Sequence, residues 1–363
     1  MKAITVKPPS KGAYISEIDL NQEKSEGLTV KILENGICGT DREIVNGIMH
    51  AASSPEGYDY LVLGHEAIGI LEDDGDFLKK GDLVMPVNRR GCGKCLNCIT
   101  GRPDFCETGL FIEAGISGMH GFMREKITDI EEYLVRVPRK IRDVAILAQP
   151  LSDLEKSFEE IIGIQKRMVW TCRDGTYNCR KALVIGTGPI GILMGLLLKS
   201  EGFIVYIANR REATEKESMI FGTVGIEYIN TRNDFNSLHK SGALFDLVVE
   251  ASGSSANLVT DSIRMLRNNG ILGIFGFSSS GSAQLDPTDL QKLVYKSLSV
   301  VGLINGQKPH FQKAMLRLAQ WNSIWPGITR ELITKTVDIN DRDSVLKALI
   351  SKEPGEIKVK ISW

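Results

Sequence analysis

The chain has 363 residues, of which 42% are hydrophobic and 25% are charged. This length and composition exclude a disordered or fibrous protein and predict two domains, at about 150 residues per domain. The 44 basic residues nearly cancel the 45 acidic ones, and the formal charge of -1 gives no general attraction to nucleic acid or to an anionic membrane. We therefore expect a small, weakly charged ligand, with neither nucleic acid nor membrane as a partner.

We expect a cytoplasmic protein, because the sequence shows neither a secretory signal nor a membrane span. The first residues, MKAITVKPPS, lack the apolar stretch of a secretory signal. The charge-free segment from Ala182 to Leu198 contains Pro189 and is shorter than the ~20 apolar residues of a membrane span. The cysteines number seven, and four of them lie within residues 92–106. An odd number with such crowding favours a metal site over disulfides.

Short β-type runs and many turn residues dominate residues 1 to about 150. The runs cover Leu28 to Leu33, Leu61 to Leu63 and Leu83 to Pro86. This texture predicts an irregular, β-rich domain. Pro150 then suits the first turn of a helix, and apolar residues recur at helical spacing after it (Leu151, Leu154, Phe158, Ile161 and Ile162), which predicts an amphipathic connecting helix.

Residues 180–304 alternate apolar runs with longer periodic or polar stretches, which is typical of a parallel sheet covered by helices. The runs are Ala182 to Ile185, Phe203 to Ile207, Phe245 to Ala251, Ile271 to Phe275 and Ser299 to Ile304. The tail from Glu356 to Trp363 alternates strictly between polar and apolar residues. It predicts a strand with one solvated face that rejoins the first domain.

A glycine-rich motif follows the first of these runs and precedes an apolar, helix-like segment. It reads Gly186-Thr187-Gly188-Pro189-Ile190-Gly191. Alone, this pattern also fits a plain strand-turn-helix corner. Between a strand and a helix it predicts a dinucleotide site, since Gly186 allows the tight turn, Gly188 lets a pyrophosphate approach, and Gly191 lets the helix pack closely.

The second run of the parallel sheet ends in Asn209-Arg210-Arg211, where an NAD site usually carries an acidic residue. Two arginines can pair with a 2′-phosphate, so the sequence predicts that NADP is accepted. The alternatives are two solvated arginines at a strand end, or an Asn209 that binds an unphosphorylated ribose. If Asn209 binds an unphosphorylated ribose, the protein uses NAD as well as NADP.

Four cysteines lie on one short segment: Cys92, Cys95, Cys98 and Cys106. Four thiolates suffice for a closed tetrahedral zinc site of structural type. An iron–sulfur cluster and a pair of disulfides are the rival interpretations. The bacterial ferredoxin spacing differs, because the last gap here is seven residues and Glu107 follows instead of proline. A reducing cytosol disfavours disulfides, so the spacing favours zinc.

A second candidate site is spread along the chain. Cys38 lies in a tight glycine-rich turn with Thr40, and His65 and Glu66 stand side by side after an apolar run. Separately, each has an ordinary explanation. A buried cysteine is often only a small hydrophobe, and a His-Glu pair often serves hydrogen bonding.

Together these motifs resemble one family. GICGTD near position 38, GHE near 65, the four-cysteine lobe and the downstream GTGPIG are similar to the zinc-dependent medium-chain alcohol dehydrogenases, over nearly the whole chain. Longer strings at residues 35–44, 86–93, 101–109 and 305–311 resemble the archaeal glucose dehydrogenase branch. The resemblance implies a GroES-like β-rich catalytic domain formed by residues 1–150 and 306–363. It also implies a connecting helix and a Rossmann domain with a doubly wound parallel sheet over residues 151–305.

The resemblance also implies the catalytic ligands. Cys38, His65 and Gln149 would hold a catalytic zinc, with Glu66 close by or exchanging into the ligand set. Gln149 departs from the wider family, which more often has cysteine or glutamate there, and otherwise it is only a polar residue before a helix. A neutral amide leaves more positive charge on the metal, which helps a bound hydroxyl to ionise. Thr40 would pass the proton outward, and two zincs per chain are expected.

The sugar and nicotinamide contacts are likewise implied by the resemblance. The expected sugar contacts are Thr40, Asn88, Glu113, Gln149, Asp153 and Asn305. The expected nicotinamide lining is Phe275, Gly276, Phe277, Leu303, Ile304 and Asn305. Each sugar contact also suits a surface or capping role, and Tyr295 stands where relatives carry histidine, which affects the range of sugars.

The resulting hypothesis is a zinc-dependent enzyme that oxidises glucose and related aldoses at C1 to the lactone, with hydride transfer to NADP or NAD. The alternatives are a zinc dehydrogenase for another polyol or polar alcohol, and a non-catalytic, NADP-binding redox sensor. By analogy with the family, the strand near Ser299 to Ile304 makes a homodimer or tetramer. Cys172 and Cys179 flank an Asp-Gly pair that signals a turn, and they are expected to be free thiols, with a disulfide as the alternative if the source is a hyperthermophile.

Overall fold

The structure is a computed structural model that describes residues 1–19, 27–232, 243–278 and 280–363. The chain forms two compact units. The first comprises Met1–Ser152 with Asn305–Trp363, and the second comprises Asp153–Ile304. The first is rich in β-strands and the second holds a parallel sheet with helices, so the expected combination of fold classes is confirmed.

The first unit is built on three sheets. Their strand orders are β2-β1-β4, then β11-β6-β5-β3-β19-β18 with β10 paired to β3, then β7-β8-β9. The strands are β1 (Lys2–Val6), β2 (Tyr14–Glu17), β3 (Leu28–Ile37), β4 (Leu61–Val62), β5 (Ala67–Leu71), β6 (Leu83–Pro86), β7 (Arg89–Arg90), β8 (Ile112–Ala114), β9 (Gly118–Met119), β10 (Lys126–Asp129), β11 (Leu134–Arg136), β18 (Ile333–Asp338) and β19 (Lys358–Ser362).

Helices and 3₁₀ turns connect these strands. They are α1 (Gly39–Val45), α2 (Leu96–Ile99), α9 (Lys308–Ile324), α10 (Ile328–Glu331) and α11 (Arg342–Ile350), with 3₁₀ turns η1 (Pro103–Phe105), η2 (Glu131–Tyr133), η3 (Arg139–Ile141) and η4 (Ala145–Leu147). A buried apolar cluster joins both ends of the chain, because Ile4 and Leu61 share it with Val359 and Ile361 of the last strand.

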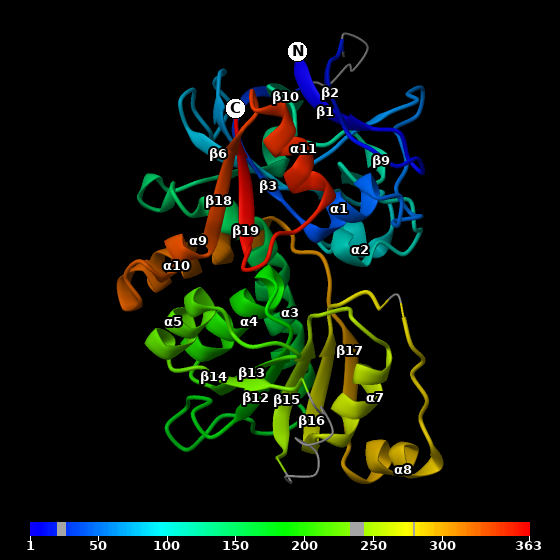
Figure 1. Cartoon of the computed structure of the whole chain (residues 1–363), viewed down its shortest axis with the longest axis vertical. Helices are drawn as coiled ribbons and strands as arrows, with labels where there is room; N and C mark the ends of the chain where they lie inside the picture. Colours follow the sequence, from blue (N-terminus) through cyan, green and yellow to red (C-terminus); the bar gives the residue numbers. More distant parts are fainter. Residues whose placement is uncertain (20–26, 233–242, 279) are drawn as a thin grey trace. The chain divides into compact units, whose positions relative to one another are not determined.

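The C-terminal strand β19 rejoins the first unit as expected. Figure 1 shows it in red beside β18, and it also pairs antiparallel with β3, with Val359 opposite Ile37. The expectation of one solvated face is wrong at Lys358, whose side chain is only 1% exposed. The reason is a buried counterion, Glu66, which contacts the Lys358 ammonium.

The second unit contains a six-stranded parallel sheet of order β14-β13-β12-β15-β16-β17. Its strands are β12 (Lys181–Ile185), β13 (Ile204–Asn209), β14 (Glu227–Asn230), β15 (Phe245–Glu250), β16 (Leu266–Ile274) and β17 (Ser299–Gly302), coloured green to orange in Figure 1. Reversal of the strand order next to β12 is the mark of a doubly wound fold. Each apolar run predicted from the sequence overlaps one strand.

Helices α3 (Ala148–Gln165), α4 (Pro189–Ser200), α5 (Glu215–Val224), α7 (Asn257–Arg264) and α8 (Pro287–Tyr295) accompany this sheet. Helix α4 packs on β12 and β13, and α7 packs on β15 and β16. Helix α5 begins with a capping box between Thr214 and Glu217 and ends at Gly225, whose φ of 73° suits a residue without a side chain. No helix in the described ranges has the length and apolar character that crossing a membrane requires.

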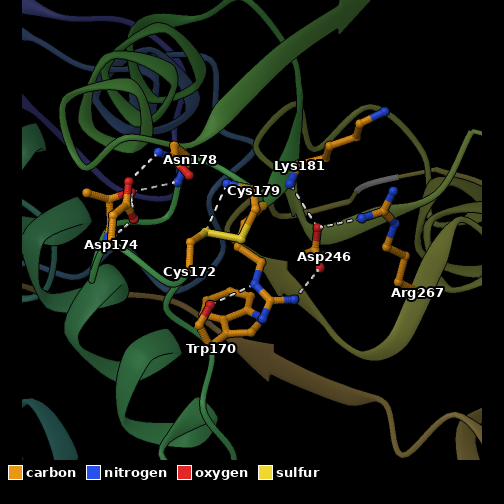
Figure 2. The surroundings of a disulfide bond; sticks show 10 residues. Trp170, Cys172, Asp174, Asn178, Cys179, Lys181, Asp246 and Arg267 are labelled. Carbon is orange, nitrogen blue, oxygen red and sulfur yellow. Dashed lines mark hydrogen bonds and ion pairs between the residues drawn. A yellow bond between two sulfur atoms is a disulfide. The ribbon is translucent and has the colours of Figure 1, made fainter.

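Cys172 and Cys179 form a disulfide between α3 and β12, which corrects the expectation of two free thiols. The loop between them is ordered by its own hydrogen bonds, which bring the two cysteines together. Asp174 accepts from the Thr176 hydroxyl at 2.8 Å and from the Asn178 amide at 2.7 Å. Figure 2 shows this loop next to Asp246, which accepts from the Lys181 main chain at the start of β12.

Candidate functional site

The antiparallel pairing of β3 with β5 brings Cys38 close to His65 and Glu66. Asn35 of β3 lies opposite Ala67 of β5, so the residues just beyond these two strand ends are neighbours. Cys38 is the N-cap of α1, and its main-chain N–H donates to Asp41 Oδ2 at 2.7 Å. This cap fixes the position of the cysteine at the strand end.

Cys38, His65 and Glu66 each offer a ligand atom, and these atoms lie within 4.8 Å of one another. His65 and Glu66 are buried, whereas Cys38 is partly exposed. Sulfur and imidazole are the donors that zinc prefers. His65 Nδ1 lies 3.6 Å from Asp41 Oδ1, and within the described residues neither buried atom has a hydrogen-bond partner. An imidazole nitrogen available in this way fits a metal ligand set.

The electrostatics of His65 depend on its carboxylate neighbour. Burial lowers the pKa of His65, but the Asp41 carboxylate raises it, and the net shift is well above the ordinary value of 6.5. Asp41 is fully buried and lies on the first turn of α1. The carboxylate therefore acts on the imidazole through its charge, because the 3.6 Å separation from Nδ1 is longer than a hydrogen bond.

Lys358 is a residue of this site that sequence analysis missed. Its ammonium donates to both oxygens of Glu66, at 2.7 and 2.8 Å, and both side chains are fully buried. The two residues are 292 positions apart, so no local motif joins them. Gly36 is part of the same packing, since a Cβ there would stand 1.8 Å from Glu66 Oε2. Glu66 is thus held beside Cys38 and His65 as one half of an ion pair.

Two more residues are predicted for the catalytic site: Thr40, two positions after Cys38, and Gln149, which is distant from both in the sequence. The Thr40 hydroxyl lies 4.0 Å from Cys38 Sγ. Gln149 is buried in the first turn of α3, where its carbonyl accepts from the Ser152 hydroxyl at 2.7 Å. Its part in a ligand set stays a prediction.

Two of the residues predicted to contact sugar, Glu113 and Asn305, come together in the first unit. The register of β7 and β8 pairs Arg89 with Glu113, and the Arg89 guanidinium donates to Glu113 Oε1 at 3.2 Å. The Asn305 amide donates to the same oxygen at 3.1 Å and accepts from Arg89. Arg89 also stacks on Phe111, 3.7 Å from the ring centroid. Sequence analysis missed Arg89, which organises this polar group.

The remaining predicted sugar contacts are placed separately. Asn88 is buried directly before β7, and its carbonyl accepts from the Ala114 main chain at 2.9 Å. Asp153 belongs to the second unit, in helix α3, where its carbonyl accepts from Ser157. Tyr295, at the end of α8, is among the most exposed aromatic residues, at 85%.

The four lobe cysteines converge between β7 and β8. The sulfur atoms of Cys92, Cys95, Cys98 and Cys106 lie within 4.8 Å of one another, and none is in a disulfide. The rival interpretation of two disulfides among these four cysteines is therefore wrong. The Thr108 hydroxyl, helped by main-chain N–H groups of residues 94 and 95, lowers the pKa of Cys92 to about 5. Such thiolates bind zinc or an iron–sulfur cluster.

The glycine-rich motif forms the predicted strand-turn-helix. Gly186 adopts a φ of 113° after β12, Gly188 caps α4, and Pro189 and Ile190 open its first turn. Gly191 is needed for close packing, because a Cβ there would stand 2.1 Å from the carbonyl oxygen of Gly186. The N–H groups of this helix start are suited to phosphate.

A pocket of about 200 Å³ lies at the carboxyl ends of β12, β13 and β15, where ligands bind in doubly wound folds. Gly186, Asn209, Arg210 and Ser252 are among its lining residues. The Asn209 amide donates to the Thr187 hydroxyl at 2.5 Å. Unlike Arg210, which lines the pocket, Arg211 directs its guanidinium to the Glu217 carboxylate.

The residues predicted to line the nicotinamide follow β16 and β17. Phe275 and Gly276 donate their main-chain N–H groups to the carbonyl of Glu250, at 2.9 and 3.1 Å. Leu303 donates to Ile274 at 2.9 Å and is buried, whereas Phe277 and Ile304 are exposed. The site residues of the second unit therefore share one end of its sheet.

Two family models match the chain. One, described as the glucose dehydrogenase C-terminus, covers residues 142–362, and the other, described as the alcohol dehydrogenase GroES-like domain, covers residues 24–139. Among curated relatives, "Glucose 1-dehydrogenase 1" of Picrophilus torridus is 56% identical, and "Glucose 1-dehydrogenase 2" of Saccharolobus solfataricus is 52% identical. Both alignments span 100% of each chain.

Solved structures show the same likeness. Glucose dehydrogenase of Haloferax mediterranei, in complex with NADP, Zn and gluconolactone, matches with a TM-score of 0.88 at 28% identity, over 100% of this chain and 99% of that one. L-Idonate 5-dehydrogenase of Escherichia coli matches with a TM-score of 0.76 at 21% identity, over 100% of this chain and 98% of that one. The second match shows the shared fold alone.

Proposed function

The chain belongs to the glucose dehydrogenase family of the zinc-dependent medium-chain dehydrogenases, and we propose that it oxidises glucose at C1 with hydride transfer to NADP. The observation that carries the proposal is the convergence of Cys38, His65 and Glu66 in a chain so similar, over its whole length, to glucose 1-dehydrogenases. The Haloferax relative, which holds NADP, Zn and gluconolactone, supports the same cofactors and a lactone product.

Bound zinc supplies a Lewis acid for the C1 hydroxyl, and bound NADP supplies the hydride acceptor. We propose that Cys38, His65 and Gln149 hold the catalytic zinc, with Glu66 beside them. Lys358 neutralises Glu66, and Gln149 carries no charge, so negative charge among these ligands is confined to the Cys38 thiolate. A ligand set with so little negative charge favours ionisation of a bound hydroxyl.

The oxidation removes one proton and one hydride from the C1 carbinol, and a lactone carbonyl remains. We propose that Thr40 accepts the hydroxyl proton and passes it to solvent, since its hydroxyl lies next to the Cys38 sulfur. When bound, the nicotinamide would accept the hydride from C1. Phe275, Gly276, Phe277, Leu303, Ile304 and Asn305 are proposed to line that ring.

Recognition of the sugar is assigned to polar side chains that pair its other hydroxyls. Glu113 and Asn305 support this role, because they form one hydrogen-bonded group. Asn88 and Asp153 complete the proposed set. A site that hydrogen-bonds hydroxyl groups discriminates strongly against sugars that lack them.

The nucleotide is assigned to the turn of Gly186, Gly188 and Gly191, with Pro189 and Ile190 at the helix start. Asn209 and Arg210 line the pocket at the end of β13, and they are proposed to contact the adenosine ribose. Because an amide can bind ribose hydroxyls and a guanidinium can bind a 2′-phosphate, we propose that NAD serves as well as NADP.

The lobe of Cys92, Cys95, Cys98 and Cys106 is assigned to a second, structural zinc, because its four sulfur donors leave no position for a substrate. We also propose a cytoplasmic homodimer or tetramer. The edge strand β17 supports assembly, since an unpaired sheet edge can pair with a second copy.

The test follows the absorbance of reduced cofactor with glucose, sorbitol and threonine, each with NADP and NAD. Rapid turnover of glucose, and slow turnover of the other two, is the expected result. A Cys38→Ser protein should lose at least ~100-fold in rate and its catalytic zinc. The matched control is the Cys172→Ser/Cys179→Ser protein, which loses two cysteines of the second unit and should turn over glucose normally below its unfolding temperature.

Two results would contradict the proposal. Preference for sorbitol or threonine would make the chain a dehydrogenase for another polar alcohol. Tight NADP binding without turnover of any alcohol, together with a single zinc per chain, would make it a nucleotide-binding redox sensor.

A further inference from the structure

A bidentate ion pair stands at the end of β13, next to the proposed ribose site. The Arg211 guanidinium contacts both oxygens of Glu217, at 2.6 Å through NH1 and 2.5 Å through NH2. Glu217 is 2% exposed, whereas the Arg211 side chain is 45% exposed. A paired guanidinium and carboxylate with this geometry is among the stronger charged contacts in proteins. The pair therefore persists in the protein without nucleotide.

Further contacts occupy the rest of the Arg211 fork. NH1 also donates to the Glu212 carbonyl at 2.8 Å, and NH2 donates to the Thr187 hydroxyl at 2.9 Å. A guanidinium has five N–H bonds, and four of those in Arg211 are directed at groups of the chain itself. Arg211 is thus fixed in place before any phosphate arrives.

Arg210 differs from its neighbour. Its side chain is exposed and lines the pocket at the end of β13. Within the described ranges, no carboxylate forms an ion pair with it and no side-chain hydrogen bond holds it. Of the two adjacent guanidinium groups, one is neutralised by a buried carboxylate and the other remains available to an anionic ligand.

The position of Glu217 is determined by the start of α5. Glu217 is the third residue of the helix, and its carboxylate accepts from the Thr214 main chain at 2.8 Å. Burial raises the pKa of Glu217, but hydrogen bonds from Arg211 and Thr214 lower it, and the net shift is below the ordinary value of 4.5. Glu217 is consequently a carboxylate at neutral pH.

We propose that Glu217 is a specificity-determining residue of the nucleotide site, because it neutralises Arg211 and so limits the preference for a nucleotide with a 2′-phosphate. Arg210 then supplies the available positive charge, and the site retains affinity for a nucleotide with two free ribose hydroxyls. This inference rests on the proposed function, since it assigns the selectivity of the same nucleotide site.

The experiment measures the dissociation constants of NADP and NAD for the full-length protein without sugar, by titration of protein fluorescence. The variant is Glu217→Gln, which removes the charge but keeps the capping box, because glutamine serves equally at that position. The ratio of the NAD constant to the NADP constant should rise at least about fivefold, because the Arg211 charge becomes available to the 2′-phosphate. An unchanged or lower ratio would overturn the proposal.

Glu212→Gln is the matched control. Glu212 is an exposed residue of the same loop. Its carboxylate accepts from Asn230, and only its main-chain carbonyl, which the substitution keeps, accepts from the Arg211 guanidinium. Its removal changes the net charge equally, so the ratio should stay within about twofold of the native value, as expected for a solvent-screened charge. An equal shift in both variants would mean that net charge alone acts, and it would refute a specific role for Glu217.

A double-mutant cycle tests the route through Arg211. Arg211→Gln should lower the ratio more in the Glu217→Gln background than in the native background, since only there does Arg211 have an available charge. Additive effects would refute the coupling. Failure of the native protein to bind either nucleotide would overturn the proposed function itself, whereas binding with an unaltered ratio would overturn only the assignment to Glu217.

Discussion

Removal of the disulfide between Cys172 and Cys179 should lower the stability of the second unit. The bond closes a short loop, since the two cysteines are 7 residues apart. Without the disulfide, the unfolded chain has more conformations available, and this higher entropy favours unfolding. The chain-entropy relation for a loop of this length gives about 2.4 kcal/mol at 25 °C.

The native contacts around the loop indicate that the folded state changes little when the bond is removed. Tyr177 stacks on Phe203, with ring centroids 4.9 Å apart, and Arg180 donates to the Trp170 carbonyl at 2.7 Å. These contacts do not involve the sulfur atoms. The loss of stability should therefore come mainly from the greater entropy of the unfolded state. For a unit of this size, a loss of about 2.4 kcal/mol corresponds to a fall of about 5 to 10 °C in the unfolding temperature.

The assay compares thermal unfolding of the native protein and the Cys172→Ser/Cys179→Ser protein, each with and without dithiothreitol. The reductant should lower the unfolding temperature of the native protein to that of the variant and should leave the variant unchanged. Because both proteins keep the four lobe cysteines, an effect of the reductant on that lobe would appear in both. Equal unfolding temperatures of the two proteins without reductant would refute the reasoning.

Three other changes have outcomes that follow from the structure. Lys358→Met leaves the buried Glu66 carboxylate without its counterion and should cost about 3 to 5 kcal/mol in urea unfolding, of which the added change Glu66→Gln should restore a large part. Cys106→Ser should lower the zinc content from about two to about one per chain by metal analysis. The Arg264 guanidinium holds the pKa of Asp289 below its ordinary value of 3.8. Asp289 therefore stabilises the fold above that pH and loses this effect as the pH falls below it, so the stability difference from Asp289→Asn should shrink on acidification from pH 6 to pH 3. A constant difference over that range would contradict the assignment.

Features encoded within a short stretch of sequence could be predicted directly. The lobe cysteines, the glycine-rich turn and the apolar runs of the parallel sheet all lie where their spacing placed them. Each depends on residues close together in the chain, because a turn, a cap or a strand is a local structure. The pairing of Cys172 with Cys179 was only the alternative expectation, since the Asp-Gly turn indicated a loop but not that Asp174 would fold it back on itself.

Partners that are distant in sequence could not be predicted, because the register of a sheet decides them. Val359 of β19 lies opposite Ile37 of β3, so Lys358 falls beside the end of β3, where Cys38 and Glu66 are. The alternation of polar residues in β19 correctly groups Lys358 and Lys360 on one face, but alternation indicates a face and not its exposure. That face meets two carboxylates, since Lys360 pairs with Glu34 at 2.9 Å just as Lys358 pairs with Glu66. A shift of one residue would turn both lysines to the opposite face and leave both glutamates unpaired, so these ion pairs specify the register that completes the site.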